Sequence, residues 1–278
     1  MENFQLRPYQ TTQLAFHINH TRSLNLSHPG TGKTPTACLY IQYLVKEKGA
    51  RVAFVMPNSL MLKNYQELLR FTEFKPEEIA IVSGSVKPAK REELYADYSK
   101  KVYIMGFSMF AKEWNRFRRN EAGWGCVIDE FHMGYKTNKS KRVQELYHAM
   151  YYMEYFLGMT GTLIDGRLDT AYPAIRIINP KYYSSHAQFM RKHAVYDIWG
   201  EFKGWTNHNL ISRILNKIAV GITFEEAYKD SPKPVFIHQV CQLDSKHEKY
   251  YKDMEELALV ELEDDYLDAH DNPGVKWT

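Results

Sequence analysis

Short, almost entirely apolar runs alternate with longer stretches in which apolar residues recur every three or four positions. The short runs have the length and composition of strands covered on both faces, and the longer stretches have the period of helices. We predict strands at 23–27, 52–56, 79–82, 102–105, 126–128 and 156–159. We predict helices at 34–46, 60–71, 89–98 and 142–153. This alternation indicates an α/β fold with a doubly wound, mostly parallel sheet, which binds ligands at the carboxyl ends of its strands.

The pattern changes after Pro180. Residues 181–205 are rich in Tyr, His and Phe without a clear period, and a helix pattern follows at 210–218. An alternating run at 235–243 predicts a strand, and Asp244 is a suitable N-cap for a final, acidic helix. We therefore predict a sheet domain at 1–180, a small, mainly helical accessory segment at 181–234, and a strand with an acidic helix at 235–278.

Composition narrows the range of partners. Charged residues make up 25% of the chain, and the formal net charge of +3 is far below that of a dedicated nucleic-acid-binding domain. Any contact with nucleic acid must therefore come from a local patch. Cys38, Cys126 and Cys241 have no paired spacing that predicts a zinc site or a redox motif. With neither a signal-peptide pattern nor a long apolar run, we expect no membrane span. The expected location is the cytoplasm of a bacterial or phage-infected cell, or the nucleus if the source is eukaryotic.

A phosphate-binding loop is the strongest chemical signal. Residues 27–34 read Ser-His-Pro-Gly-Thr-Gly-Lys-Thr and stand between a predicted strand and a predicted helix. Glycines at these positions let backbone N–H groups surround a phosphate, and the helix N-terminus adds to the anion site. The fully written Walker A pattern has Gly where this chain has Ser27, and a chance Gly-rich loop is the alternative interpretation. The residues expected to bind ATP here are Pro29, Gly30, Thr31, Gly32, Lys33 and Thr34. Of these, Lys33 would reach the β- and γ-phosphates and Thr34 would be a ligand of Mg²⁺.

Two carboxylates follow the predicted strand at 126–128. Successive residues point in opposite directions at a strand end, so Asp129 and Glu130 can take separate roles. We expect Asp129 to hold Mg²⁺ and Glu130 to orient the attacking water, which makes Lys33, Asp129 and Glu130 the predicted catalytic set. Taken alone, such a pair would also fit a helix cap or a solvated turn.

Several segments resemble the superfamily 2 helicases of the Swi/Snf-like group. Residues 129–132, Asp-Glu-Phe-His, resemble the DExH box, with Phe131 in place of the common Ala. Residues 6–10, Leu-Arg-Pro-Tyr-Gln, resemble the family's opening motif, and residues 136–141 resemble the segment after the box. The resemblance implies a RecA-like P-loop NTPase domain in which Gln10 hydrogen-bonds adenine and Arg7 also contacts the nucleotide.

Residues 158–162, Gly-Met-Thr-Gly-Thr, resemble motif III of the same family, although a simple glycine turn would also explain them. The resemblance implies that His132, Thr160, Gly161 and Thr162 couple the ATP site to a neighbouring surface. It also implies phosphate contacts to nucleic acid from loops at strand ends, without sequence specificity. Those expected contacts are Pro57, Asn58, Ser59, Lys63, Gly84, Ser85 and Ser108. Each of these is also an ordinary turn or surface residue.

These observations predict the ATP-binding first motor domain of a DNA-dependent helicase or translocase, with DNA favoured over RNA as the partner. No second set of RecA-like motifs follows residue 243, so we expect a fragment or one half of a split motor that needs a second RecA-like domain, in cis or in trans, to hydrolyse ATP efficiently. Two alternatives stay open. One is a noncatalytic, nucleotide-gated module that binds DNA or protein, and the other is a P-loop kinase that acts on a small molecule.

Overall fold

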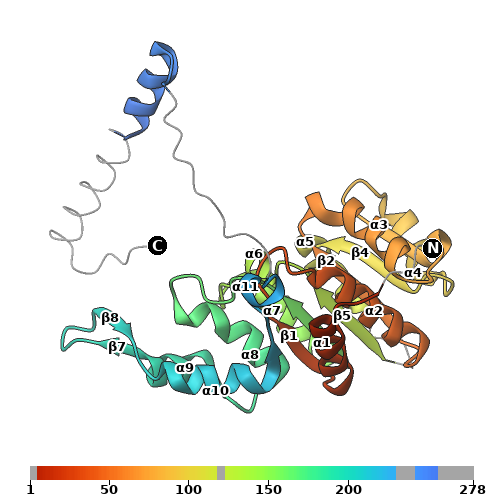
Figure 1. The fold of residues 1–278 in the computed structure, drawn as a ribbon, viewed down its shortest axis with the longest axis horizontal. Coiled ribbons are helices and arrows are strands. Elements are labelled where there is room, and N and C mark those ends of the chain that lie inside the picture. The colour runs from red at the N-terminus through yellow and green to blue at the C-terminus, as the bar shows by residue number, and fades with distance from the viewer. Residues whose placement is uncertain (1–4, 118–122, 230–241, 256–278) are drawn as a thin grey trace. The chain divides into compact units, whose positions relative to one another are not determined.

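The computed structural model describes residues 5–117, 123–229 and 242–255. The chain divides into a unit at 1–230 and a second unit at 231–278. Within the described residues of the first unit, seven strands form a parallel sheet in the order β3-β4-β2-β5-β6-β1-β9 (Figure 1). The strands are β1 (Arg22–Asn25), β2 (Arg51–Met56), β3 (Ile79–Val82), β4 (Val102–Gly106), β5 (Trp124–Ile128), β6 (Tyr155–Met159) and β9 (Ala219–Val220).

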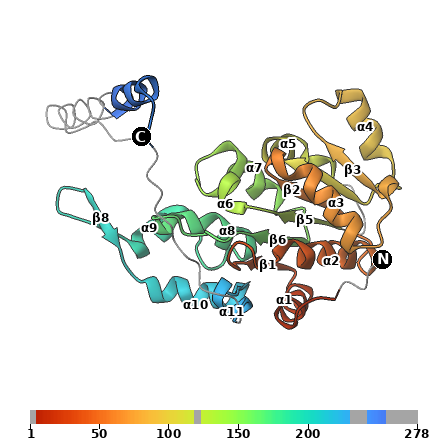
Figure 2. The ribbon, with the colours of Figure 1, turned by 45° about the horizontal axis from the view of Figure 1, so that its top comes forward.

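Helices cover both faces of this sheet (Figures 1 and 2). On β2, Val52, Phe54 and Met56 pack towards one face and Ala53 and Val55 towards the other, as the two-residue period of a strand requires. The first face is covered by α1 (Pro8–Asn19), α2 (Lys33–Lys46) and α3 (Met61–Phe71). The second is covered by α5 (Phe107–Glu113), α7 (Lys141–Ala149), α8 (Tyr172–Ile178) and α10 (His208–Ile218). Among the described residues before 180, the other α-helices are α4 (Pro88–Ala96) and the short α6 (Phe131–Tyr135). The predicted doubly wound α/β fold is confirmed.

The segment after residue 180 contains more than helices. It folds as α9 (His186–His193), an antiparallel hairpin of β7 (Ala194–Tyr196) and β8 (Phe202–Trp205), then α10, β9 and α11 (Phe224–Ala227). Two of its aromatic residues, Tyr183 and Phe189, are buried, and Phe189 packs edge to face on Tyr183 and on Tyr172 of α8. Strand β9 pairs with β1, so the chain returns to the sheet beyond the predicted boundary at residue 180.

Some predicted ends differ from the observed ones. The first strand ends at Asn25, because Ser27 already belongs to the loop that follows. The predicted strand at 235–243 falls, up to residue 241, outside the described residues. In the second unit, residues 245–255 are helical, and the Asp244 carboxylate accepts the backbone N–H groups of Lys246 and His247 at 3.1 and 2.9 Å. Among the described helices, none combines the length and the apolar character needed to cross a bilayer.

Candidate nucleotide site

The phosphate loop, residues 27–34, connects β1 to α2. Gly30 and Gly32 have φ angles of 80° and 78°, a left-handed conformation that favours glycine. Lys33 starts α2, and its ammonium donates to the carbonyl oxygens of Ser27 at 2.9 Å and His28 at 3.2 Å. The turn thus brings the Lys33 side chain back over the loop, at the N-terminus of a 14-residue helix.

Helix α1 holds this loop from the side, although the sequence did not predict a helix there. The Tyr9 hydroxyl donates to the Thr31 carbonyl at 2.8 Å, and the Gln10 amide donates to the Gly32 carbonyl at 3.0 Å. The Gln13 amide donates to the Ser27 hydroxyl at 2.9 Å. This last bond gives a physical reason for Ser at the position where the Walker A pattern has Gly. The spacing of Gln10 and Gln13 on one helical face was a sequence signal for this arrangement.

The predicted acidic pair lies at the end of β5. Asp129 is buried, and its carboxylate accepts the Glu130 backbone N–H at 3.0 Å and the Asn64 amide at 3.5 Å. Glu130 has φ 48° and ψ 50°, a left-handed conformation that is strained for a residue with a side chain. Its side chain is 35% exposed, so it reaches solvent while Asp129 does not. The two adjacent carboxylates therefore have different environments.

The sheet order brings the loop and the acidic pair together. Strands β1 and β5 both pair with β6, so their carboxyl ends lie at the same edge, one strand apart. Burial lowers the pKa of Lys33, and the charges of Glu130 and Asp129 oppose this shift. Burial raises the pKa of Asp129, with a further increase from Glu130, whereas the Lys33 ammonium lowers it. The three predicted catalytic residues thus lie close enough to interact electrostatically.

The predicted coupling residues connect these two loops. His132 Nδ1 lies 2.8 Å from the Thr160 hydroxyl, and the Thr162 backbone N–H donates to that same hydroxyl at 3.1 Å. The Thr160 backbone N–H donates to the Asn25 carbonyl at 3.0 Å, at the end of β1. A Cβ atom at Gly161 would lie 2.8 Å from Pro29 Cδ, so this glycine packs directly on the phosphate loop. Residues 160–162 therefore contact both the phosphate loop and the segment that follows the acidic pair, and their coupling role stays a prediction.

The predicted nucleic-acid contacts also gather at this sheet edge. We call residues 57–59, 84–85 and 108 the strand-end loops, because they follow β2, β3 and β4, and residue 108 lies in the first turn of α5. The Asn58 side chain packs on Gly106, which joins the first and third loops. Arg142 donates to the Ser108 hydroxyl at 2.9 Å, and Lys63 is exposed on the first turn of α3. Their role as contacts stays a prediction.

A contribution from beyond residue 218 was not anticipated. The backbone N–H groups of Leu26 and His28 donate to the carbonyls of Val220 and Ile222 at 2.7 and 3.0 Å. The Tyr228 hydroxyl donates to the Gly30 carbonyl at 2.9 Å, and the Arg7 guanidinium lies 4.5 Å from the centre of the Tyr228 ring. This segment therefore covers the phosphate loop beside Arg7. No motif marks it, because its contacts come mostly from backbone atoms.

Among the described residues, no group of three or more His, Cys, Asp and Glu side chains could hold a metal ion. Mg²⁺ needs no such group, because it keeps several waters and is bound by one or two carboxylates together with substrate phosphates.

Comparisons with known proteins agree with this geometry. A family model described as "Type III restriction enzyme, res subunit" matches residues 3–165, more than half of the chain. No curated protein matches the sequence. The structure is similar to the Sulfolobus solfataricus SWI2/SNF2 ATPase core in complex with dsDNA, with a TM-score of 0.62 and 17% identity over 79% of this chain and 45% of that one. It is also similar to the Pyrococcus furiosus Hef helicase domain, with a TM-score of 0.55 and 18% identity over 69% of this chain and 41% of that one.

The chain thus spans less than half the length of these two solved proteins, and the likeness to them is one of fold. The family match includes the phosphate loop, the strand-end loops and the acidic pair. The chain belongs to the family of the type III restriction enzyme res subunit, with the fold of the first RecA-like domain of superfamily 2 helicases.

Proposed function

We propose that this chain binds MgATP and acts as the first motor domain of a nucleic-acid-dependent ATPase of the helicase or translocase type. Hydrolysis would require a second RecA-like domain that completes the site and supplies arginine side chains for the transition state. The observation that carries the proposal is the convergence of Lys33, Asp129 and Glu130 at one sheet edge, beside a glycine loop that leads into a helix.

The residues of the site fit a magnesium-bound triphosphate. The Lys33 ammonium would bind phosphate oxygens, and the loop N–H groups would surround them. The Thr34 hydroxyl and the Asp129 carboxylate would hold Mg²⁺, which neutralises charge on the phosphates when bound. Burial of Asp129 next to Glu130 leaves concentrated negative charge, which a divalent cation would offset. Glu130, at the end of the strand and partly exposed, would orient the attacking water.

Adenine selection is assigned to Gln10. Its amide oxygen accepts the Arg7 backbone N–H at 2.9 Å, and its amide nitrogen donates to the Gly32 carbonyl. These bonds fix the orientation of the amide and leave one N–H and one lone pair for a base. Arg7, packed on Tyr228, would contact the nucleotide beside Gln10.

The nucleic acid is proposed to be DNA, bound through its phosphates by the strand-end loops. The Sulfolobus structure of similar fold is a complex with dsDNA, which supports this partner. Binding should be nonspecific and should weaken steeply with salt. The contact between His132 and Thr160 offers a physical route by which a change at Glu130 would reach the surface of the domain.

A nucleotide titration with a fluorescent ATP analogue tests the proposal. Lys33→Ala should abolish tight binding, because it removes the cation aimed at the phosphates. Lys46→Ala is the matched control, since Lys46 lies in the last turn of the same helix and is exposed. Unchanged affinity in Lys33→Ala would refute the phosphate site.

A second assay measures phosphate release with and without DNA, in the presence of a second RecA-like domain. Stimulation by DNA is expected. Tight ATP binding without any turnover would favour the noncatalytic module. Phosphate transfer to a small acceptor would favour the kinase.

A further inference from the structure

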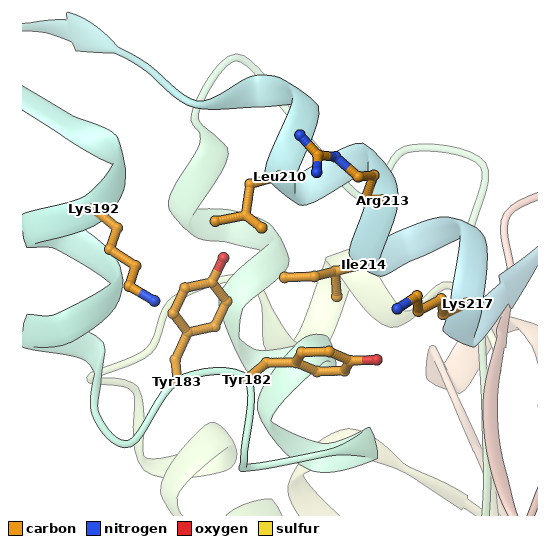
Figure 3. A pocket seen from close by; sticks show the side chains of 7 residues that line it. All are labelled: Tyr182, Tyr183, Lys192, Leu210, Arg213, Ile214 and Lys217. Carbon is orange, nitrogen blue, oxygen red and sulfur yellow. The ribbon is translucent and has the colours of Figure 1, made fainter.

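A basic pocket of about 230 Å³ lies between α9 and α10, away from the nucleotide site. Figure 3 shows Lys192 reaching in from α9, with Leu210, Arg213, Ile214 and Lys217 on α10 at the other side. Tyr182 and Tyr183 complete the lining. The described residues that line the pocket thus include three cations and no acid.

The three cations have no acidic partner in the part of the chain that the structure describes. Within the described ranges, none of them forms an ion pair, whereas Lys136 pairs with Asp165 at 3.2 Å in a different pocket. Arg213 and Lys217 are four residues apart on α10, so their positive charges lie side by side. Their repulsion destabilises the helix when no anion is bound. Lys192 is the third positive charge at this pocket, and its ammonium lies 5.5 Å from the centre of the Tyr183 ring. A bound phosphate would offset this repulsion.

The hairpin next to the pocket exposes two large apolar side chains. Ile198 is 90% exposed and Trp199 is 82% exposed, at the turn between β7 and β8. The Asp197 carboxylate holds this turn, because it accepts the backbone N–H groups of Trp199 and Glu201 at 3.0 and 2.9 Å and pairs with Lys203 at 3.0 Å. These bonds lower the pKa of Asp197. Trp199 is therefore presented to solvent by an ordered turn.

The hairpin and the five pocket residues on α9 and α10 belong to one continuous segment, residues 186–218, which we call the hairpin arm. Lys192 is two residues before β7, and α10 begins three residues after β8. In Figures 1 and 2 the hairpin projects away from the sheet. Cations that bind phosphates, combined with exposed aromatic rings that stack on bases, form the usual surface for single-stranded nucleic acid.

We propose that the hairpin arm is a second nucleic-acid contact, separate from the strand-end loops. Backbone phosphates of neighbouring nucleotides bind at Lys192, Arg213 and Lys217, one at each cation, and an unpaired base stacks on Trp199. This inference rests on the proposed function, because it presumes that the chain binds nucleic acid. It adds that the chain prefers unpaired strands to duplex.

Fluorescence anisotropy with labelled single-stranded DNA and blunt duplex DNA tests the arm, using the full chain. The triple variant Lys192→Gln, Arg213→Gln, Lys217→Gln should weaken both complexes. The slope of log affinity against log salt should fall by about 2 for single strands and about 3 for duplex, if each cation contacts one phosphate. Trp199→Ala should weaken single-strand binding at least about fivefold and change duplex binding little, because stacking needs an unpaired base. Trp199→Tyr should bind almost as well as the native chain.

Matched control variants test whether the position of the cations on the arm matters, or only the number of charges removed. Lys48→Gln, Lys75→Gln, Lys101→Gln removes three cations that precede β2, β3 and β4, at the opposite sheet edge, and should leave the affinity nearly unchanged. Tyr98→Ala removes another ring, 75% exposed, and should have no effect. If the arm variants bind as the native chain does while Lys63→Gln weakens binding, the arm proposal is overturned, the proposed function stands, and a protein partner becomes the better occupant of the hairpin. If the native chain binds neither DNA, both proposals fall.

Discussion

Replacement of Gly32 by Ala tests the geometry of the nucleotide site directly. Gly32 has φ 78°, and a Cβ atom there would lie 2.6 Å from Gln10 Nε2, closer than atoms can approach. Gln10 must therefore move, and its hydrogen bond to the Gly32 carbonyl must weaken or break. The substitution acts on the backbone of the phosphate loop and on the residue proposed to select adenine.

The magnitude follows from these two effects. A left-handed conformation costs a residue with a side chain roughly 1–2 kcal/mol. Loss of the bond between Gln10 and Gly32 adds about 0.5–1.5 kcal/mol. We expect Gly32→Ala to lower the free energy of unfolding by about 1.5–3.5 kcal/mol.

Substitution of two other glycines distinguishes the backbone cost from the loss of the hydrogen bond, measured by urea unfolding. Gly166 has φ 67° with no heavy atom within 4 Å of its Cβ position, so Gly166→Ala should show only the backbone cost of roughly 1–2 kcal/mol. Gly84 has open space and no left-handed strain, so Gly84→Ala should stay within about 0.5 kcal/mol of the native chain. The expected order of destabilisation is Gly32, then Gly166, then Gly84.

Nucleotide preference is the second measurement on the same variant. Displacement of Gln10 should reduce the preference for ATP over GTP in competition titrations. If Gly32→Ala were no more destabilising than Gly166→Ala and kept full ATP preference, the close packing of Gln10 on the loop would be wrong.

Three further predictions concern the acidic pair, the coupling segment and a buried histidine. In a motor with both RecA-like domains, Glu130→Gln should keep ATP binding but stop turnover, and hydrolysis at the native rate would remove Glu130 from its proposed role. Thr160→Val removes the hydroxyl that lies 2.8 Å from His132, so DNA stimulation of phosphate release should fall severalfold while ATP binding persists; full stimulation would contradict the coupling route. Burial lowers the pKa of His17 to about 4, below its usual 6.5, so the unfolded chain binds the proton first as the pH falls. The free energy of unfolding should therefore decrease by roughly 3 kcal/mol between pH 6.5 and 4, and His17→Gln should flatten this part of the urea-unfolding profile.

Local sequence predicted the central sheet well, and it predicted that the candidate site residues lie near one another. Strand β2 is apolar on both faces, as Phe54 on one face and Val55 on the other show. The glycine spacing of the phosphate loop is typical of phosphate binding when it stands between a strand and a helix. The convergence of Lys33 with Asp129 and Glu130 followed from the rule that parallel strands place their carboxyl ends at one edge.

Other features depended on contacts between distant segments. Tyr228 reaches Gly30 across 198 positions, and β9 consists of two residues, too few for any periodicity. Helix α1 was overlooked because it buries Gln10, Gln13 and His17 in place of an apolar stripe. The hairpin was unexpected because Ile198 and Trp199 point into solvent, against the usual tendency of such side chains.

Strand β9 determines where this chain can be shortened, because it pairs with β1 at the end of the sheet. A fragment cut at residue 180, where the apolar pattern changes, would lose Val220 and Ile222 and leave the β1 edge unpaired beside the buried Leu24. An uncovered edge strand of this kind is a template for pairing with other molecules. Such fragments should aggregate during expression, whereas a fragment that extends through Tyr228 keeps its own edge protected.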